Sequence, residues 1–151
     1  YGESLMELLT KPEGAYVVDL GCGNGMLTKK LAEKGYHVLG VDDSEAMLKL
    51  AEKNCSGTSF QKGNAVDFSL EQKADAIFSN AVLHWIDAKD QQKMLDNICH
   101  QLVPGGEFVC EFGGYGCAEQ PLFFPSVQSA PYALPLSLRY FIRTARNRIR
   151  T

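Results

Sequence analysis

The sequence predicts an α/β domain built on a Rossmann-like, doubly wound sheet that is mainly parallel. Short apolar runs alternate with helix-like segments through the first two thirds of the chain, and the first run passes straight into a glycine-rich turn. At 151 residues, with 45% hydrophobic residues, the chain suits one compact domain. Right-handed crossovers between parallel strands would place a binding site at the carboxyl ends of the strands.

The individual elements follow from apolar spacing, caps and breakers. Gly35 is a typical residue after a helix end, Ser44 is a typical N-cap, and Pro104-Gly105-Gly106 ends a helix. Apolar stripes at helical spacing predict helices in residues 1–10, 26–34, 44–51 and 88–102. Short apolar runs predict strands at 15–20, 37–41, 58–61, 74–79 and 107–112.

Composition and charge argue against several classes of protein. A net charge of −3 does not suggest a nucleic-acid binder, and no apolar stretch approaches the roughly 20 residues that a membrane-spanning helix needs. Five scattered cysteines without a C-x-x-C pair are typical of reduced thiols. We therefore expect a cytoplasmic protein without a metal site.

The turn after the first strand has the pattern G-x-G-x-G, at Gly21, Gly23 and Gly25, and the acid Asp19 precedes it. Glycine lets the backbone approach a ligand without a Cβ in the way and permits positive φ. Free N–H groups at the start of the following helix can then face an anionic group of a nucleotide-like cofactor. A dinucleotide fingerprint would need glycine where Met26 stands. Glycines that serve packing alone remain the structural alternative.

This turn resembles motif I of the class I S-adenosylmethionine (SAM) dependent methyltransferases. The resemblance implies SAM as the cofactor, with Gly21, Cys22 and Gly23 along its methionine end and Asp19 orienting its ammonium group. Cys22 fits between two glycines through its small size rather than through reactivity. An NAD-binding Rossmann module is the competing interpretation, and Met26 speaks against it.

A second motif reads GVDDSEAML, from Gly40 to Leu48, and resembles the family segment GVDxSxxML. An acid at the end of the second strand, here Asp42, can accept hydrogen bonds from both ribose hydroxyls. Asp43 joins the predicted cofactor-binding residues as an exposed acid at the start of the next helix, where the helix dipole favours it. NAD-binding folds use the same acid, so Asp42 alone does not choose the cofactor.

A third element, Gly63-Asn64-Ala65, resembles the family's G-D-A segment, whose acid accepts from the adenine amino group. The resemblance assigns Asn64 and Ala65 to adenine. The amide oxygen of Asn64 can accept a hydrogen bond, but without the assistance of a charge. Asp67 could substitute for it, and a plain turn residue is the alternative for Asn64.

A fourth element, ADAIFSNAVLHW at residues 74–85, resembles the segment FDAVFSNAALHW of bacterial methyltransferases related to the trans-aconitate methyltransferase group. The resemblance implies that Asn80 lies beside the reactive sulfonium and that His84 lies near the acceptor. His84 is the candidate general base if the acceptor must lose a proton, and a structural histidine is the alternative. The segment LVPGGEFV at 102–109 resembles the family's turn into strand five.

The resemblance covers residues 1–116, which we predict to be a SAM-binding core with strand order 3-2-1-4-5. It stops before the hairpin of strands six and seven that completes the family's sheet, and residues 117–151 are proline-rich and then basic. Three interpretations of this tail stay open: a truncated or frame-shifted end, a basic helix at 137–150 that docks beside strand five, and a segment that binds acidic lipid or RNA.

The sequence therefore predicts a SAM-dependent methyltransferase that acts on a small-molecule acceptor. The resemblance implies a carboxylate oxygen as the acceptor atom. A truncated, non-catalytic remnant that still binds SAM is the alternative, because part of the usual acceptor pocket would be missing. Neither a nucleic acid nor a membrane is an expected partner.

Overall fold

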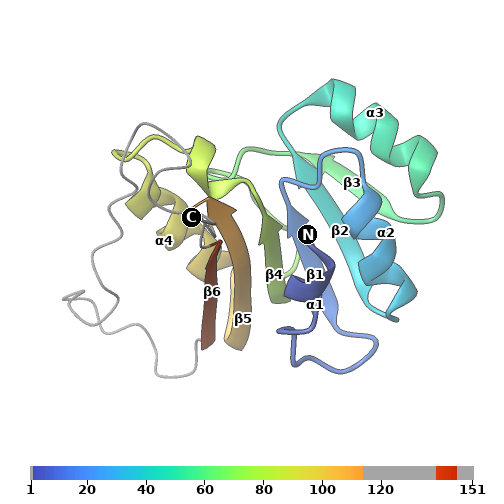
Figure 1. Cartoon of the computed structure of the whole chain (residues 1–151), viewed down its shortest axis with the longest axis horizontal. Coiled ribbons are helices and arrows are strands. Elements are labelled where there is room, and N and C mark those ends of the chain that lie inside the picture. The colour runs from blue at the N-terminus through green and yellow to red at the C-terminus, as the bar shows by residue number, and fades with distance from the viewer. Residues whose placement is uncertain (1, 114–138, 146–151) are drawn as a thin grey trace, which may run out of the picture.

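A computed structural model of the chain describes residues 2–113 and 139–145. Six parallel strands form one sheet in the order β3-β2-β1-β4-β5-β6 (Figure 1). The order of the first five strands confirms the predicted 3-2-1-4-5 arrangement. The strands are β1 (Tyr16–Leu20), β2 (His37–Asp42), β3 (Ser59–Lys62), β4 (Ala74–Asn80), β5 (Leu102–Gly113) and β6 (Arg139–Ala145), and the helices are α1 (Glu3–Met6), α2 (Met26–Glu33), α3 (Glu45–Asn54), the 3-10 turn η1 (Leu83–Trp85) and α4 (Gln91–Gln101).

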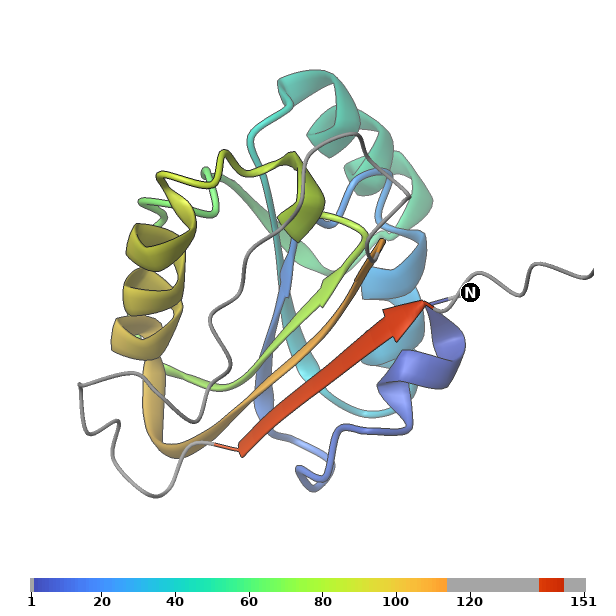
Figure 2. The same ribbon diagram turned by 60° about the vertical axis from the view of Figure 1, so that its left-hand side comes forward.

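Helices cover both faces of the sheet, with α4 on one side and α1, α2 and α3 on the other (Figure 2). Ile98 of α4 packs in one buried apolar cluster with Val18, whereas Leu31 of α2 packs in a second cluster with Val17. Neighbouring residues of a strand point to opposite faces, so β1 supplies both clusters. Among the helices of the described residues, none has the length and apolarity needed to cross a membrane.

Two helices are shorter than the sequence predicts. The helix expected over residues 1–10 is α1, which covers only Glu3–Met6. Leu9, beyond its end, still packs in the apolar cluster of α2. The apolar spacing in residues 1–10 therefore reflects buried positions that extend beyond the end of the helix. The helix expected from residue 88 begins at Gln91.

The Pro-Gly-Gly segment at 104–106 does not separate a helix from a strand as expected. Strand β5 begins directly after α4, because Leu102 already pairs with Ala74. The next pair joins Glu107 to Ala76, so several extra residues of β5 lie opposite a single residue of β4. The segment thus forms a bulge inside β5, and its central glycine takes a φ of +77°.

Residues 139–145 form strand β6, which corrects the predicted helix at 137–150. The strand runs parallel to β5, with Glu107 opposite Arg139 and Gly113 opposite Ala145. A strand edge offers a row of unpaired N–H and C=O groups, and the run Tyr140-Phe141-Ile142 has high strand propensity. Pairing with the edge of β5 therefore determines the structure of residues 139–145, whereas the helical spacing of the arginines does not. The other residues of 117–151 lie outside the described part of the chain.

The N-cap of α3 is a point at which a local prediction can be tested. The Ser44 hydroxyl accepts a hydrogen bond from the Met47 N–H at 3.4 Å, as the sequence predicts. We expect Ser44→Ala to lower the free energy of unfolding by about 1 kcal/mol, because a cap is lost. Urea titration measures the change. Ser56→Ala, on the exposed turn after α3, should alter stability by less than about 0.5 kcal/mol.

Candidate cofactor and acceptor site

The glycine loop leaves β1 at the carboxyl edge of the sheet and is fastened to the neighbouring strand β2. The N–H groups of Gly21 and Cys22 both donate to the carbonyl oxygen of Val41, at 2.7 and 3.1 Å. The loop then turns into α2 with positive φ values at Gly21 (+76°), Gly23 (+53°) and Gly25 (+79°). Side chains other than hydrogen are disfavoured at all three positions.

The three glycines differ in what surrounds them. A Cβ at Gly21 would lie 2.1 Å from Val82 Cγ2, and a Cβ at Gly25 would lie 2.9 Å from Ala51 Cβ. A Cβ at Gly23 would meet nothing within 4 Å. Gly21 and Gly25 thus permit close packing, whereas Gly23 faces open space in which a ligand can approach the backbone.

The Asp42 carboxylate joins the glycine loop to the start of α3. Its Oδ2 accepts from the Gly23 N–H at 2.8 Å, and its Oδ1 accepts from the Ser44 N–H at 2.9 Å. The N–H groups of Gly21, Cys22 and Gly23 are therefore engaged within the protein. A carboxylate has about four acceptor positions, so Asp42 retains the capacity to accept from a ligand as well.

Asp19 lies beneath the loop with only 2% of its surface exposed. The Thr28 hydroxyl of α2 donates to Asp19 Oδ2 at 2.6 Å. Burial raises the pKa of Asp19 from its usual 3.8 to about 6; the Thr28 hydrogen bond opposes that rise, and the nearby charge of Asp42 adds to it. Asp19 therefore ties α2 to β1.

The raised pKa of Asp19 predicts a pH-dependent loss of stability. Below about pH 4 the carboxyl group is neutral in both states, whereas between pH 4 and pH 6 the unfolded chain ionises first, so stability falls as the pH rises. The shift corresponds to at most about 3 kcal/mol, and relaxation around the charge should reduce the measured loss to about 1–2 kcal/mol. Because asparagine mimics the neutral carboxyl group, urea titrations of the native chain and Asp19→Asn should agree at low pH and diverge as the pH rises, with the native chain losing stability relative to the variant. Parallel curves would contradict the assignment.

Cys22 is buried against the neighbouring strand. Its Sγ would lie 3.0 Å from a Cβ at Gly40, and burial is the main cause that raises the pKa of its thiol to about 12. A thiol that stays protonated at neutral pH is a poor nucleophile. The buried position of Cys22 thus agrees with the expectation that this residue is there because it is small and not because it is reactive.

Asn64 is exposed in the turn after β3, while Ala65 beside it is buried. The Asn64 Oδ1 accepts from the Val66 N–H at 2.9 Å, and its Nδ2 donates to Asp43 Oδ2 at 3.3 Å. Asn64 therefore serves as a turn residue, and it also brings the Asp43 side chain next to the predicted adenine position.

The loop after β4 carries the one non-glycine residue with positive φ among the described residues, Ala81 at +60°. Its N–H donates to the carbonyl oxygen of Glu111 at 2.7 Å, which fixes the loop to the end of β5. Asn80 lies just before it, with its side-chain amide carbon 3.2 Å from the Cβ position of Gly2. Strained backbone of this kind is concentrated at ligand sites.

The turn η1 follows directly and presents His84 and Trp85. Their ring centroids lie 5.0 Å apart, and Trp85 is 79% exposed. The His84 Nδ1 and the Glu111 Oε2 are buried and find no hydrogen-bond partner within the described part of the chain. Glu111 is not among the residues that the sequence motifs predict, although an acid inside the apolar run FVCEF is a usable signal.

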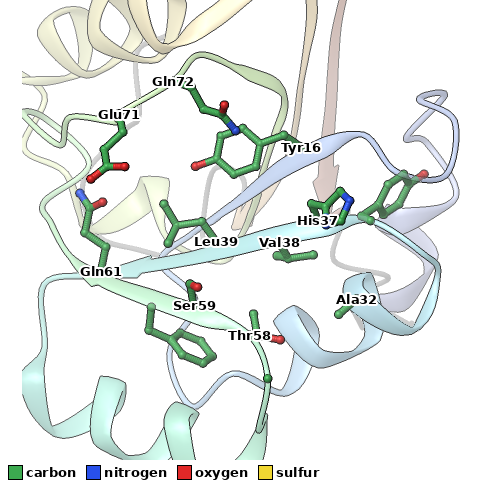
Figure 3. Close-up of a pocket in the computed structure, with 13 residues that line it drawn as sticks. Tyr16, Ala32, His37, Val38, Leu39, Thr58, Ser59, Gln61, Glu71 and Gln72 are labelled. Atoms are coloured by element: carbon green, nitrogen blue, oxygen red, sulfur yellow. The ribbon is translucent and has the colours of Figure 1, made fainter.

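A large hollow of about 920 Å³ lies elsewhere, at the amino-terminal ends of β1, β2 and β3 (Figure 3). Tyr16 and Leu39 line it on one side of the strands, and Ala32 and Thr58 line it on the other. The sheet therefore divides the hollow. It lies at the opposite ends of the strands from the glycine loop, so we do not assign it to the site.

A family described as "Methyltransferase domain" matches residues 17–106, which is more than half of the chain. The chain belongs to this methyltransferase family. The match spans the glycine loop, Asp42, Asn64, Asn80 and His84, so all the polar groups described above except Glu111 fall within the methyltransferase domain.

Known methyltransferases resemble the chain in sequence and in structure. It is 35% identical over 104 residues to a trans-aconitate 2-methyltransferase of Acidovorax sp. (strain JS42), covering 68% of this chain and 40% of that protein. It is 31% identical over 148 residues to a trans-aconitate 2-methyltransferase of Variovorax paradoxus, covering 94% and 56%. A SAM-dependent methyltransferase of Mesorhizobium loti superposes with a TM-score of 0.62 at 31% identity, covering 71% of this chain and 50% of that one.

These matches bear on the extent of the methyltransferase domain. The chain spans about half the length of the two curated relatives. The Variovorax alignment covers 94% of the chain and so must continue well past residue 116. The alignment thus includes part of the segment for which the sequence leaves three interpretations open.

Proposed function

We propose that the chain is the cofactor-binding part of a SAM-dependent methyltransferase that acts on a small-molecule acceptor. The observation that carries this proposal is the open space at Gly23 beside the Asp42 carboxylate. A hydroxyl-bearing ligand there can approach the backbone closely and donate hydrogen bonds to a fixed, charged acceptor. The sequence relatives named as methyltransferases support the same reading.

The proposed cofactor contacts follow the order of the strands. Asp42 accepts from the ribose hydroxyls, and the turn after β3 lies at the adenine. The loop after β1 lies along the methionine end, where Asp19 acts from beneath through α2. The full proposed set of cofactor-binding residues is Asp19, Gly21, Cys22, Gly23, Asp42, Asp43, Asn64, Ala65 and Asn80.

SAM, when bound, supplies an electrophilic methyl group on a sulfonium, and the electron pair of the broken carbon–sulfur bond stays on sulfur. The contribution of this chain is to hold an acceptor in line with that group and to exclude water, which can supply most of the rate enhancement. The strained Ala81 peptide, fixed to β5, gives that end of the site a defined geometry. His84 takes up a proton when the acceptor must lose one.

The acceptor class is open to two arguments. The names of the trans-aconitate relatives favour a carboxylate oxygen, as the sequence resemblance implies. The side chains near the carboxyl ends of β4 and β5 favour an amine as the acceptor instead. We also place the protein in the cytoplasm, because its five scattered cysteines, without a C-x-x-C pair, are typical of reduced thiols.

A non-catalytic remnant that binds SAM is the second candidate, which the sequence leaves open; the chain aligns with 40% and 56% of the two relatives' own length. Transfer of a radiolabelled methyl group to a panel of amines, alcohols and carboxylates, set beside equilibrium dialysis with labelled SAM, separates the two. Binding together with transfer supports the enzyme, and binding without transfer supports the remnant. No binding would overturn both.

A further inference from the structure

Two unsatisfied polar atoms lie at the carboxyl ends of neighbouring strands. Glu111 Oε2 and His84 Nδ1 are both buried, and both lack a hydrogen-bond partner among the described residues. An unpaired buried polar atom costs free energy and is rare in folded proteins. Two such atoms at one edge of the sheet indicate a site at which a bound ligand supplies the missing hydrogen-bond partners.

The backbone brings these residues to the same edge. Glu111 is paired with Asn80 in the β4–β5 ladder, and its carbonyl oxygen accepts from the Ala81 N–H. The turn η1, with His84, follows three residues later and contacts β5. Both residues therefore lie beside the strained loop at which the proposed methyl transfer takes place.

The chemistry of the two groups selects among ligands. An ionised carboxylate only accepts hydrogen bonds, so Glu111 needs a donor. A ligand carboxylate would place a second negative charge near it and leave it unpaired. An amine supplies donors for both Glu111 and the imidazole of His84, and its positive charge is attracted to the carboxylate.

Trp85 adds an independent observation. This side chain is 79% exposed beside His84, and it is the single tryptophan of the chain. The face of an indole ring attracts cations, whereas it offers nothing comparable to an anion. An exposed tryptophan beside His84, in the turn that contacts the strand of Glu111, suits a small cationic ligand.

We propose that Glu111 binds the acceptor and that the acceptor is a small primary amine, so that the reaction is N-methylation. This inference rests on the proposed function. Glu111 holds the ammonium by a charge-assisted hydrogen bond. The nitrogen loses one proton to His84, and the lone pair so released forms an N–C bond as the methyl carbon–sulfur bond breaks with its electron pair left on sulfur. The imidazolium then passes its proton to water.

The test uses Trp85 fluorescence of the whole chain, first saturated with S-adenosylhomocysteine and then titrated. The amine probes are 2-aminoethanol and n-butylamine, and the anionic probes are succinate and trans-aconitate. We expect the amines to change the fluorescence saturably and the carboxylates to have no effect. Glu111→Gln should weaken amine binding at least 10-fold, while S-adenosylhomocysteine binding stays as in the native chain.

Glu107 provides the matched control on the same strand, because its buried carboxylate accepts from the Thr10 N–H at 3.0 Å and from the Thr10 hydroxyl. Glu107→Gln should lower the melting temperature, whereas Glu111→Gln should leave it unchanged or raise it. The proposal is overturned if carboxylates rather than amines change the fluorescence. It also fails if neither class does, or if Glu111→Gln lowers the melting temperature as much as Glu107→Gln. Failure of S-adenosylhomocysteine to bind would instead overturn the proposed function itself.

Discussion

Replacing Gly21 by alanine is expected to destabilise the folded chain by about 4 kcal/mol. The residue has a φ of +76°, and its new Cβ would lie 2.1 Å from Val82 Cγ2 and 3.0 Å from Val82 Cβ. The left-handed conformation costs about 1–2 kcal/mol for a residue with a Cβ, and overpacking adds about 1–3 kcal/mol. Val82 belongs to the strained loop after β4, so the substitution should displace the acceptor end of the site as well. Urea titration followed by circular dichroism measures the loss.

Gly14→Ala is the control that separates conformation from crowding. Gly14 has a similar φ of +84°, but nothing lies within 4 Å of its Cβ position. Its substitution should therefore cost only the conformational part, about 1–2 kcal/mol. If the two variants lost the same stability, contact between the glycine loop and Val82 would not be what requires glycine at position 21.

Replacing Asp42 by alanine is expected to weaken S-adenosylhomocysteine binding at least 100-fold. In the proposed complex the carboxylate accepts from both ribose hydroxyls, and hydrogen bonds to a charged group are worth about 1.5–3 kcal/mol each. The substitution also removes the acceptor for the Gly23 and Ser44 N–H groups, at 2.8 and 2.9 Å, so the loop itself should loosen. Isothermal titration calorimetry measures the change in affinity.

Asp96→Ala controls for the loss of one negative charge, because Asp96 is exposed on α4, on the far face of the sheet from α3. It should change the affinity less than about threefold. An equal loss of affinity in the two variants would mean that overall charge, rather than the position of Asp42, governs binding. The melting temperatures of both variants without ligand show how much of the effect is loss of folding.

The sequence was most informative where one local pattern has one physical meaning. Alternating apolar runs and helical stripes predicted the first five strands, and the central strands β1 and β4 are buried on both faces between helices. The Ser44 cap was predictable from one residue and its neighbours. Gly23 could be assigned to open space only once the structure showed what surrounds it, since Gly21 and Gly25 look the same in sequence and are packed.

The failures share a cause, which is that a distant segment decides the local outcome. Strand β6 forms because β5 offers an open edge, and nothing within residues 139–145 reveals that edge. The bulge at 104–106 depends on Ala74 pairing with Leu102. Glu111 looked like part of a strand, and its significance comes from burial without a partner. The depth of Asp19 under the loop is likewise a tertiary property.

Thermal unfolding with S-adenosylhomocysteine tests most directly whether this chain has a working cofactor site. At about 100 times the dissociation constant, binding should add about 2.7 kcal/mol, which raises the melting temperature of a domain of this size by about 5–10 °C. The rise should depend on ligand concentration, be absent with NAD, and disappear in Asp42→Ala. No rise, or an equal rise with NAD, would contradict a SAM site formed by the glycine loop and Asp42.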